Sequence, residues 1–148
     1  MKSLKLASLL TYAVALLHAA IIFGGADWYR FFGAGEELAN MQEQGLYYPA
    51  ILTLAIAILL CIAASYALFG SGFMKPLPFT KPVLTITAMV FLGRGLFAIP
   101  LILLVDDPYF LELRLKMPFM IITSVFCFGL GAIFAVGRLS LKTENPPK

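Results

Sequence analysis

Four long hydrophobic runs constrain this chain more than any other feature of its sequence. They cover about residues 6–23, 50–69, 83–105 and 118–137. Each is close to the ~20 apolar residues that an α-helix needs to cross the hydrocarbon core of a bilayer. In lipid, such a run must satisfy its backbone hydrogen bonds internally, and an α-helix does so. The runs therefore predict an all-α, polytopic membrane protein with four transmembrane helices.

The composition agrees with this class. Hydrophobic residues make up 61% of the 148 positions and charged residues 13%, and the mean hydropathy is +0.91. A soluble domain is nearer half apolar and a quarter charged. We expect one transmembrane domain over residues 1–148, with its helices running alternately up and down in a bundle. The net charge of +3 lies at the helix ends rather than on one basic face, so no nucleic-acid partner is expected.

The longest connection is the predicted outer loop, residues 24–49. Aromatic rings prefer the headgroup level of a membrane, and four stand at its two ends: Trp28, Tyr29, Tyr47 and Tyr48. Its middle, residues 36–44, has the pattern of a short interfacial helix that stops at Gly45. The loop can lie on the membrane surface or fold over the bundle as a lid. Residues 138–148 are expected to form a loose tail.

The distribution of basic residues predicts the orientation. With both termini cytoplasmic, the inner side holds Lys2, Lys5, Lys75, Lys81, Arg138, Lys142 and Lys148. The outer side then holds Arg30, Arg114 and Lys116. Because Lys and Arg concentrate on the cytoplasmic side of membrane proteins, both termini are predicted to be cytoplasmic.

One guanidinium stands in the middle of the third run. Arg94 lies eleven residues from either end of residues 83–105, near the expected bilayer midplane. Such a placement costs about 2.5–3.5 kcal/mol on insertion scales, and an arginine cannot lose its proton to avoid that cost. Arg94 is therefore predicted to face the protein interior or a wet cavity. Gly93 and Gly95 permit close approach of a helix or ligand, and Pro100 predicts a kink.

These constraints predict a binding site between the first and third helices. Thr87 precedes Arg94 by seven residues and Thr11 precedes His18 by seven, so each pair shares a helix face. Carboxylates of the outer loop can neutralise Arg94 when no ligand is bound. The predicted ligand-binding residues are Arg94, His18, Thr87, Thr11, Glu36, Glu37 and Glu43.

A guanidinium among apolar walls suits an anionic or carbonyl-bearing amphiphile: a lipid headgroup, a fatty acid or a quinone. Two structural alternatives stay open. Arg94 can be a clamp bonded to backbone carbonyls, and His18 can be a neutral imidazole bonded to a carbonyl at a helix contact. One histidine and two separated cysteines form no recognisable metal-ligand set. No catalytic motif is present, so no catalytic residue or cofactor is predicted.

The layout resembles the DoxX-like family of small bacterial membrane proteins, on four helices, a polar centre and an aromatic, acidic first outer loop. The run HAAIIFGGADWYRFFGAGEELANM looks like the first loop of uncharacterised proteobacterial inner-membrane proteins. This resemblance implies a bacterial inner-membrane location and transfers no functional residue.

A second resemblance is local. The run FLGRGLFAI around Arg94 is similar to the third-helix arginine segment of the MAPEG enzymes, which work as trimers with glutathione between subunits. By that resemblance only Arg94 carries over, as a glutathione-side arginine. The second helix of MAPEG enzymes has an Arg, Asn and Glu cluster, whereas residues 50–69 carry no charge here.

The leading hypothesis is a non-enzymatic protein that binds an anionic or amphipathic small molecule, or helps to transport it, at Arg94. The alternatives are a MAPEG-like, glutathione-dependent enzyme and a structural subunit of a membrane complex. Membrane lipid is an expected partner. Small residues of the fourth run, Gly129, Gly131 and Ala135, offer a face for homo-oligomer formation.

Overall fold

A computed structural model describes residues 2–73 and 75–143, with the side chains of residues 142 and 143 left out. Within these ranges the chain forms seven α-helices, one short π-helical segment and no strand, which confirms the all-α class. The elements are α1 (Lys2–Gly24), α2 (Ala26–Phe31), α3 (Glu36–Glu43), α4 (Tyr48–Leu68), η1 (Phe69–Phe73), α5 (Thr80–Leu104), α6 (Pro108–Arg114) and α7 (Met117–Thr143).

Four helices are long and apolar enough to cross a membrane: α1, α4 with η1, α5 and α7. They coincide with the four predicted runs. The last helix is longer than predicted, because α7 continues to Thr143 and makes residues 138–143 helical rather than a loose tail. Gly137 does not end this helix. It lies against Leu4 of α1, so its missing side chain permits close helix packing instead. Residues 144–148 of the predicted tail lie outside the described residues.

The short helices lie between the spanning ones. The predicted helix near residues 36–44 is α3. The other two are α2, within the predicted outer loop, and α6, in the connection between the third and fourth hydrophobic runs. The start of α6 has a clear local cause, since the Asp107 carboxylate accepts a hydrogen bond from the Tyr109 N–H at 2.9 Å and Pro108 occupies the first turn.

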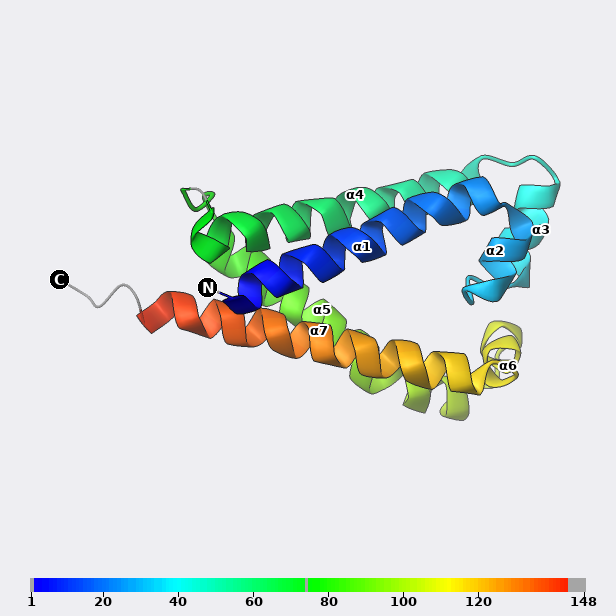
Figure 1. The fold of residues 1–148 in the computed structure, drawn as a ribbon. Coiled ribbons are helices and arrows are strands. Elements are labelled where there is room, and N and C mark those ends of the chain that lie inside the picture. The colour runs from blue at the N-terminus through cyan, green and yellow to red at the C-terminus, as the bar shows by residue number, and fades with distance from the viewer. Residues whose placement is uncertain (1, 74, 144–148) are drawn as a thin grey trace.

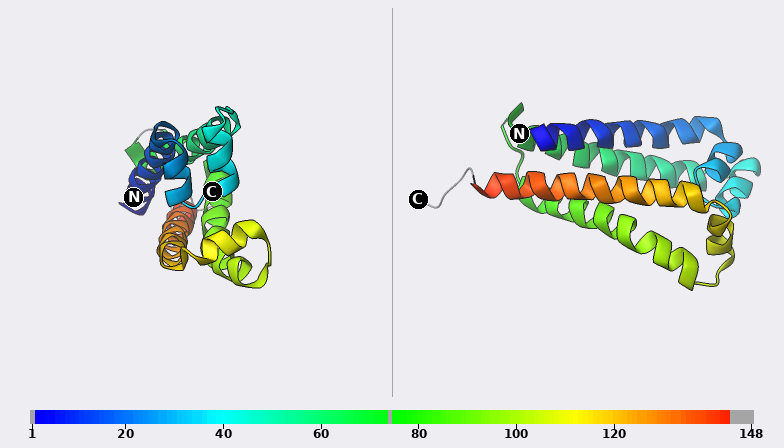
Figure 2. Two further views of the ribbon diagram at one scale, coloured as in Figure 1. Left: turned by 90° about the vertical axis from the view of Figure 1, so that its right-hand side faces the viewer. Right: turned by 60° about the horizontal axis from the view of Figure 1, so that its bottom comes forward.

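The spanning helices form two pairs. α1 packs along α4, and α5 packs along α7. In Figure 1 the pairs meet at the end that carries both termini, the terminal end, and move apart toward α2, α3 and α6. Figure 2 shows the three short helices together at that opposite end, the far end.

The hydrophobic core follows this shape. One cluster, called here the apolar joint, unites the four spanning helices at the terminal end. It consists of Leu4, Ala7, Ala67, Leu84, Ala88, Phe91, Leu130 and Phe134. The far end has two separate clusters. Ile21, Tyr29 and Ala39 belong to the α1 side, and Ile102, Leu113 and Met120 belong to the α5 side. The pairs therefore share a core at one end only.

The end of α5 at the far end is held by a side chain. The Arg114 guanidinium donates to the carbonyl oxygens of Ile102, Leu103 and Val105 at 2.7, 3.0 and 3.3 Å. It also contacts the Asp106 carboxylate at 3.0 Å. These carbonyls have no partner within the helix, so Arg114 acts as a C-terminal cap. α5 runs as one helix through Pro100.

Candidate functional site

Arg94 lies near the middle of α5. It follows Phe91 of the apolar joint by three residues and Thr87 by seven, so the three side chains share one helix face. At about 1.5 Å per residue, Arg94 is ~15 Å below the far end of the helix. It therefore follows Phe91, the last α5 member of the shared core, by one turn on the same face.

The Arg94 guanidinium makes one hydrogen bond in the described part of the chain. It donates to the Ser124 hydroxyl of α7 across 3.4 Å, which is long for such a bond. Ser124 is buried, whereas Arg94 remains exposed. Arg94 is thus exposed, and among residues 2–73 and 75–143 most of its five N–H donors meet no acceptor, backbone carbonyls included.

Gly95 explains why α7 comes so close to Arg94. A Cβ atom at Gly95 would lie 2.7 Å from the Phe128 main-chain nitrogen, so a side chain there would separate α5 from α7. Gly131 of α7 lies equally close to Leu92 of α5. By contrast, a Cβ atom at Gly93 would meet no atom within 4 Å. Of the two glycines beside Arg94, Gly95 permits the helix contact and Gly93 faces open space.

The packing of Gly131 limits the face of Gly129, Gly131 and Ala135 that was predicted to be available for homo-oligomer formation. Gly131 is already used against α5 inside the chain, and Gly129 is the glycine of that set that remains exposed.

A groove of about 270 Å³ follows the contact between α5 and α7. Its walls are mainly apolar, and its lining includes Gly95, Ile99, Ile121, Ser124 and Phe128. Arg94 does not line this groove. Ser124 lines the groove and accepts the hydrogen bond from Arg94.

The remaining helix residues of the predicted site are engaged locally. The Thr11 hydroxyl is fully buried and donates to the Ala7 carbonyl of its own helix at 2.7 Å. The His18 Nδ1 lies 2.8 Å from the Val14 carbonyl, as in the structural alternative for this residue. Thr87 is half-buried. No hydrogen bond or ion pair joins Arg94 to any of the three among the described residues.

The predicted carboxylates surround a different arginine. Arg30 of α2 donates to Glu36 at 2.9 and 3.0 Å and to Glu43 at 2.6 Å. These hydrogen bonds lower the pKa of both carboxyl groups and raise that of Arg30. Glu37 is exposed. The structure thus places Glu36 and Glu43 against Arg30 rather than against Arg94.

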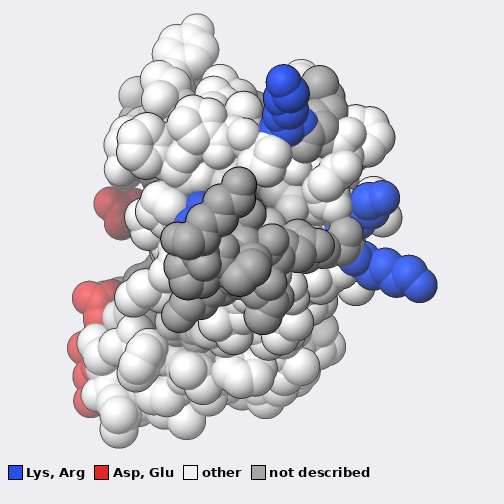
Figure 3. Space-filling view, turned by 90° about the vertical axis from the view of Figure 1, so that its left-hand side faces the viewer, with Lys and Arg blue, Asp and Glu red and all other residues white. Residues whose placement is uncertain are grey.

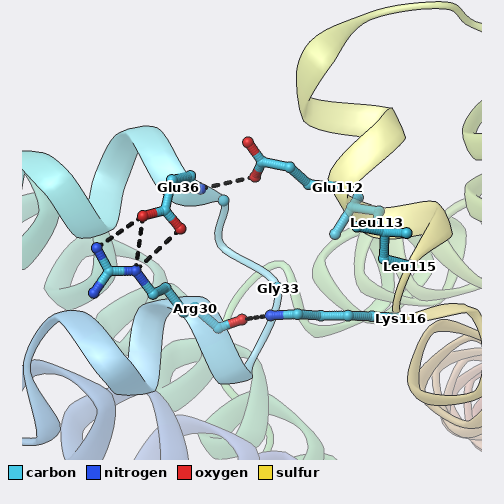
Figure 4. A pocket seen from close by; sticks show the side chains of 8 residues that line it. Arg30, Gly33, Glu36, Glu112, Leu113, Leu115 and Lys116 are labelled. Carbon is cyan, nitrogen blue, oxygen red and sulfur yellow. Dashed lines mark hydrogen bonds and ion pairs between the residues drawn. The ribbon is translucent and has the colours of Figure 1, made fainter.

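A second group of contacts, called here the latch, joins the helix pairs at the far end. Three side chains bind main-chain atoms of residues 30–36. Tyr109 Oη donates to the Gly33 carbonyl at 3.2 Å, Glu112 Oε2 accepts from the Glu36 N–H at 2.9 Å, and Lys116 Nζ donates to the Arg30 carbonyl. Figure 4 shows the Glu112 and Lys116 contacts beside a cavity of about 230 Å³.

The electrostatics connect the latch to Arg94. Burial raises the pKa of Tyr109, while the Arg94 charge opposes this rise and Glu112 adds to it.

Comparisons with protein-family models, curated proteins and solved structures find no match. No group of three or more His, Cys, Asp or Glu side chains that could hold a metal ion occurs among the described residues.

Sequence reasoning missed Ser124 and the latch. Ser124 stands on the small-residue face of the fourth run, but its pairing with Arg94 depends on which helices pack together. The latch could have been found from a spacing in the sequence. Tyr109, Glu112 and Lys116 are separated by three and four residues, a spacing that brings side chains together on one helix face.

Proposed function

We propose that this multi-pass membrane protein binds an anionic or amphipathic small molecule at Arg94, without catalysing a reaction on it. The polar group of the ligand bonds to the Arg94 guanidinium, and its apolar part lies among the helices. A lipid headgroup, a fatty acid or a quinone has the required oxygen atoms and apolar body. The observation that carries this proposal is an exposed guanidinium at mid-helix depth whose single partner among the described residues lies 3.4 Å away.

The physical argument rests on unsatisfied donors. A guanidinium stays charged at any accessible pH, and each of its donors needs an acceptor where the surroundings are apolar. The Ser124 hydroxyl supplies one distant acceptor. Carboxylate, phosphate and carbonyl oxygens match the planar fork of donors that remains. His18, Thr11, Glu36 and Glu43 already have protein partners, so Arg94 is the residue on which binding depends.

One alternative has an observation in its favour. The Arg94–Ser124 contact joins α5 to α7, as expected if Arg94 only locks the bundle of a structural subunit. Against this, the bond is long and Gly95 already holds the two helices in close contact. The MAPEG-like alternative stays a prediction of the sequence. The polar side chains Thr53 and Ser65 of α4 donate to carbonyls of their own helix.

We also propose that both termini are cytoplasmic, in a bacterial inner membrane. Five described basic residues belong to the terminal end: Lys2, Lys5, Lys75, Lys81 and Arg138. Figure 3 shows Lys and Arg on this face, with Asp and Glu only at its edge. The three basic residues of the far end are each bonded to carbonyl or carboxylate oxygens. The positive-inside rule supports a cytoplasmic terminal end, and the DoxX-like layout supports the bacterial location.

Thermal unfolding of Arg94→Gln with and without ligand tests the proposal. The probes are sodium oleate, decylubiquinone and phosphatidylglycerol, each added to the purified protein in detergent. At about 100-fold excess over Kd, a bound ligand raises the Tm of the natural protein by about 5–10 °C. Arg94→Gln is expected to remove most of that rise, and Ser124→Ala to remove less.

The matched control is Lys81→Gln, which removes an exposed positive charge from the terminal end of the same helix. It should leave the ligand-dependent rise unchanged. Equal rises in Arg94→Gln and the natural protein would refute the binding proposal. A loss of unliganded stability with an unchanged rise would instead support the structural role.

A further inference from the structure

A second cavity at the far end is lined by one acidic and three aromatic side chains. It has a volume of about 470 Å³, and its described lining consists of Asp27, Trp28, Phe31 and Phe32. The first three belong to α2 and the fourth is the residue that ends it, at the far end in Figure 2. Because residues three and four apart recur among them, they form one face of this short helix. The volume lies in the range of pockets that bind small molecules, about 300–1,000 Å³.

The aromatic rings of this cavity are set at different angles. The Trp28 and Phe32 rings have centroids 5.8 Å apart and planes inclined by 48°. Phe31 meets Phe32 edge to face, with centroids 5.0 Å apart and an interplanar angle of 84°. Trp28 and Phe31 keep 41% and 64% of their surface exposed, so part of each ring is free to contact a ligand. Aromatic faces carry partial negative charge, and a group of inclined rings therefore attracts cations.

Packing holds all three rings in place. A Cβ atom at Gly24 would overlap the Trp28 ring, so the missing side chain of Gly24 leaves the space that the indole occupies. Phe31 and Phe32 both approach Phe119 of α7, with centroids 6.0 and 6.2 Å away. The aromatic walls are thus positioned before a ligand arrives, which lowers the entropic cost of binding.

The charge of the cavity also suits a cation. The Asp27 side chain is 94% exposed, and its ion pair with Arg30 spans 3.5 Å. Arg30 makes shorter ion pairs, of 2.8 and 2.6 Å, with Glu36 and Glu43. Because nearer carboxylates match the Arg30 charge, the Asp27 carboxylate keeps acceptor capacity for a second cation. The described lining includes no Lys or Arg.

We propose that this cavity, called here the aromatic cage, binds the ammonium group of an organic cation. The rings of Trp28, Phe31 and Phe32 contact the carbon atoms around the nitrogen, as aromatic cages do for quaternary ammonium groups. The Asp27 carboxylate balances the charge. The cage shares no residue with the Arg94 site and prefers the opposite charge. An amine-bearing lipid headgroup and a free organic cation carry the same group, and the experiment distinguishes the two sources.

Two probes of equal shape test whether the cage selects a charge. Choline carries a trimethylammonium group, and 3,3-dimethyl-1-butanol has a carbon atom in place of the charged nitrogen. Binding of each is titrated by saturation-transfer NMR with the purified protein in a maltoside detergent, which has no ammonium group. Choline is expected to bind about tenfold more tightly than the uncharged analogue, because cation–π attraction acts on choline alone.

Fluorination of one ring tests the cage without changing its shape. Trp28 is the single tryptophan of the 148 residues, so biosynthetic incorporation of fluorotryptophan modifies the cage alone. Fluorine withdraws electrons from the ring face and weakens its attraction for a cation. Incorporation of 5-fluorotryptophan and of 5,7-difluorotryptophan should raise the Kd for choline in steps, by about twofold and about fivefold. The Kd for 3,3-dimethyl-1-butanol should not change.

The contribution of the carboxylate is tested by Asp27→Asn. This variant should raise the Kd for choline about threefold, because an exposed charge pair is weak. The matched control is Glu37→Gln, which removes an exposed carboxylate of the same loop that does not line the cage. It should leave the Kd for choline unchanged.

Lipid discs distinguish the two sources of the ammonium group. Choline is titrated into protein in discs of phosphatidylglycerol alone and in discs that also contain phosphatidylethanolamine. A higher apparent Kd in the second discs means that the lipid ammonium group competes for the cage. Equal Kd values assign the cage to a free organic cation. Both results keep the ammonium site.

Equal Kd values for choline and its uncharged analogue would overturn the proposal and leave these rings as anchors at the headgroup level. An unchanged Kd for choline after fluorination of Trp28 would do the same, as would the absence of choline binding in phosphatidylglycerol discs. These measurements are independent of Arg94→Gln, so the cage and the Arg94 site stand or fall separately.

Discussion

The two ends of this bundle are held together by opposite kinds of contact. The apolar joint unites all four spanning helices through buried side chains such as Leu4, Leu84 and Phe134. The latch joins the same two helix pairs through hydrogen bonds from Tyr109, Glu112 and Lys116 to a main-chain segment. One end is closed by packing, and the other by polar contacts at the surface.

This difference assigns distinct roles to the two ends. Packed apolar contacts cannot be replaced by water without loss, whereas surface hydrogen bonds can. The joint is therefore the fixed end, and the latch is the end whose contacts water can replace. Arg94 lies on α5 between them, one turn beyond Phe91 of the apolar joint. Three changes test this division, from the largest expected effect to the smallest.

Removing Phe134 should weaken the fixed end most. Its ring is fully buried and stacks on Phe91 with centroids 5.9 Å apart. Phe134→Ala is expected to lower the free energy of unfolding by about 3 kcal/mol, because the cavity loses packing contacts. Equilibrium unfolding with added denaturing detergent measures this change.

Phe126→Ala is the matched control, since Phe126 is an exposed residue of the same helix. It should cost less than about 1 kcal/mol. Equal losses in the two variants would mean that the apolar joint is not the fixed end of the bundle.

A side chain at Gly95 tests whether α5 and α7 move as one body. Gly95→Ala brings a Cβ atom to 2.7 Å from the Phe128 backbone, and backbone cannot yield as a flexible side chain does. The expected loss is about 1–3 kcal/mol. Gly93→Ala adds the same atom where nothing lies within 4 Å. It should gain about 0.5–1 kcal/mol from helix propensity. Thermal unfolding of both variants checks the contrast, and equal shifts would contradict it.

The smallest effect concerns the acid response of the segment that the latch holds. Hydrogen bonds from Arg30 lower the pKa of Glu36 and Glu43 in the folded protein. A carboxyl group whose pKa is lower in the folded than in the unfolded protein stabilises the folded state at pH values above its unfolded-state pKa. This stabilisation is lost as the pH falls through the lower, folded-state pKa. The cluster should therefore persist into the acid range in which free carboxylates already take up protons.

Carboxyl carbon shifts of labelled glutamate, followed by NMR during acidification, measure this response. Arg30→Gln should move the titration midpoints of Glu36 and Glu43 upward. Unchanged midpoints in that variant would show that Arg30 is not the cause of the lowered pKa values.

Much of the fold could be predicted from the sequence, because hydrophobic run length and local helix signals act over short stretches. The four spans and α3 follow from them. α6 did not, although Asp107 followed by Pro108 is a recognisable helix start. The end of α7 was predicted too early, because Gly137 served packing against Leu4 rather than helix termination.

The site was less accessible to such reasoning. The mid-run position of Arg94 identified it as a residue that needs explanation. Its partner Ser124 could not be assigned, since hydrophobic periodicity does not show that α5 packs on α7 and α1 on α4. The carboxylates were predicted to serve Arg94, but Arg30 is only six residues from Glu36 and lies in the same loop. The nearer charge determines the pairing.

Arg114 affects the field that an approaching anion meets. The carbonyl end of a helix carries a partial negative charge, roughly half an electron, and at the far end of α5 this pole would repel carboxylates and phosphates. The Arg114 guanidinium lies directly on those carbonyls. Part of that pole is thus compensated by a permanent cation, which the Asp106 carboxylate also shares. The carbonyl end of α5 therefore opposes the attraction of Arg94 less than a bare helix end would.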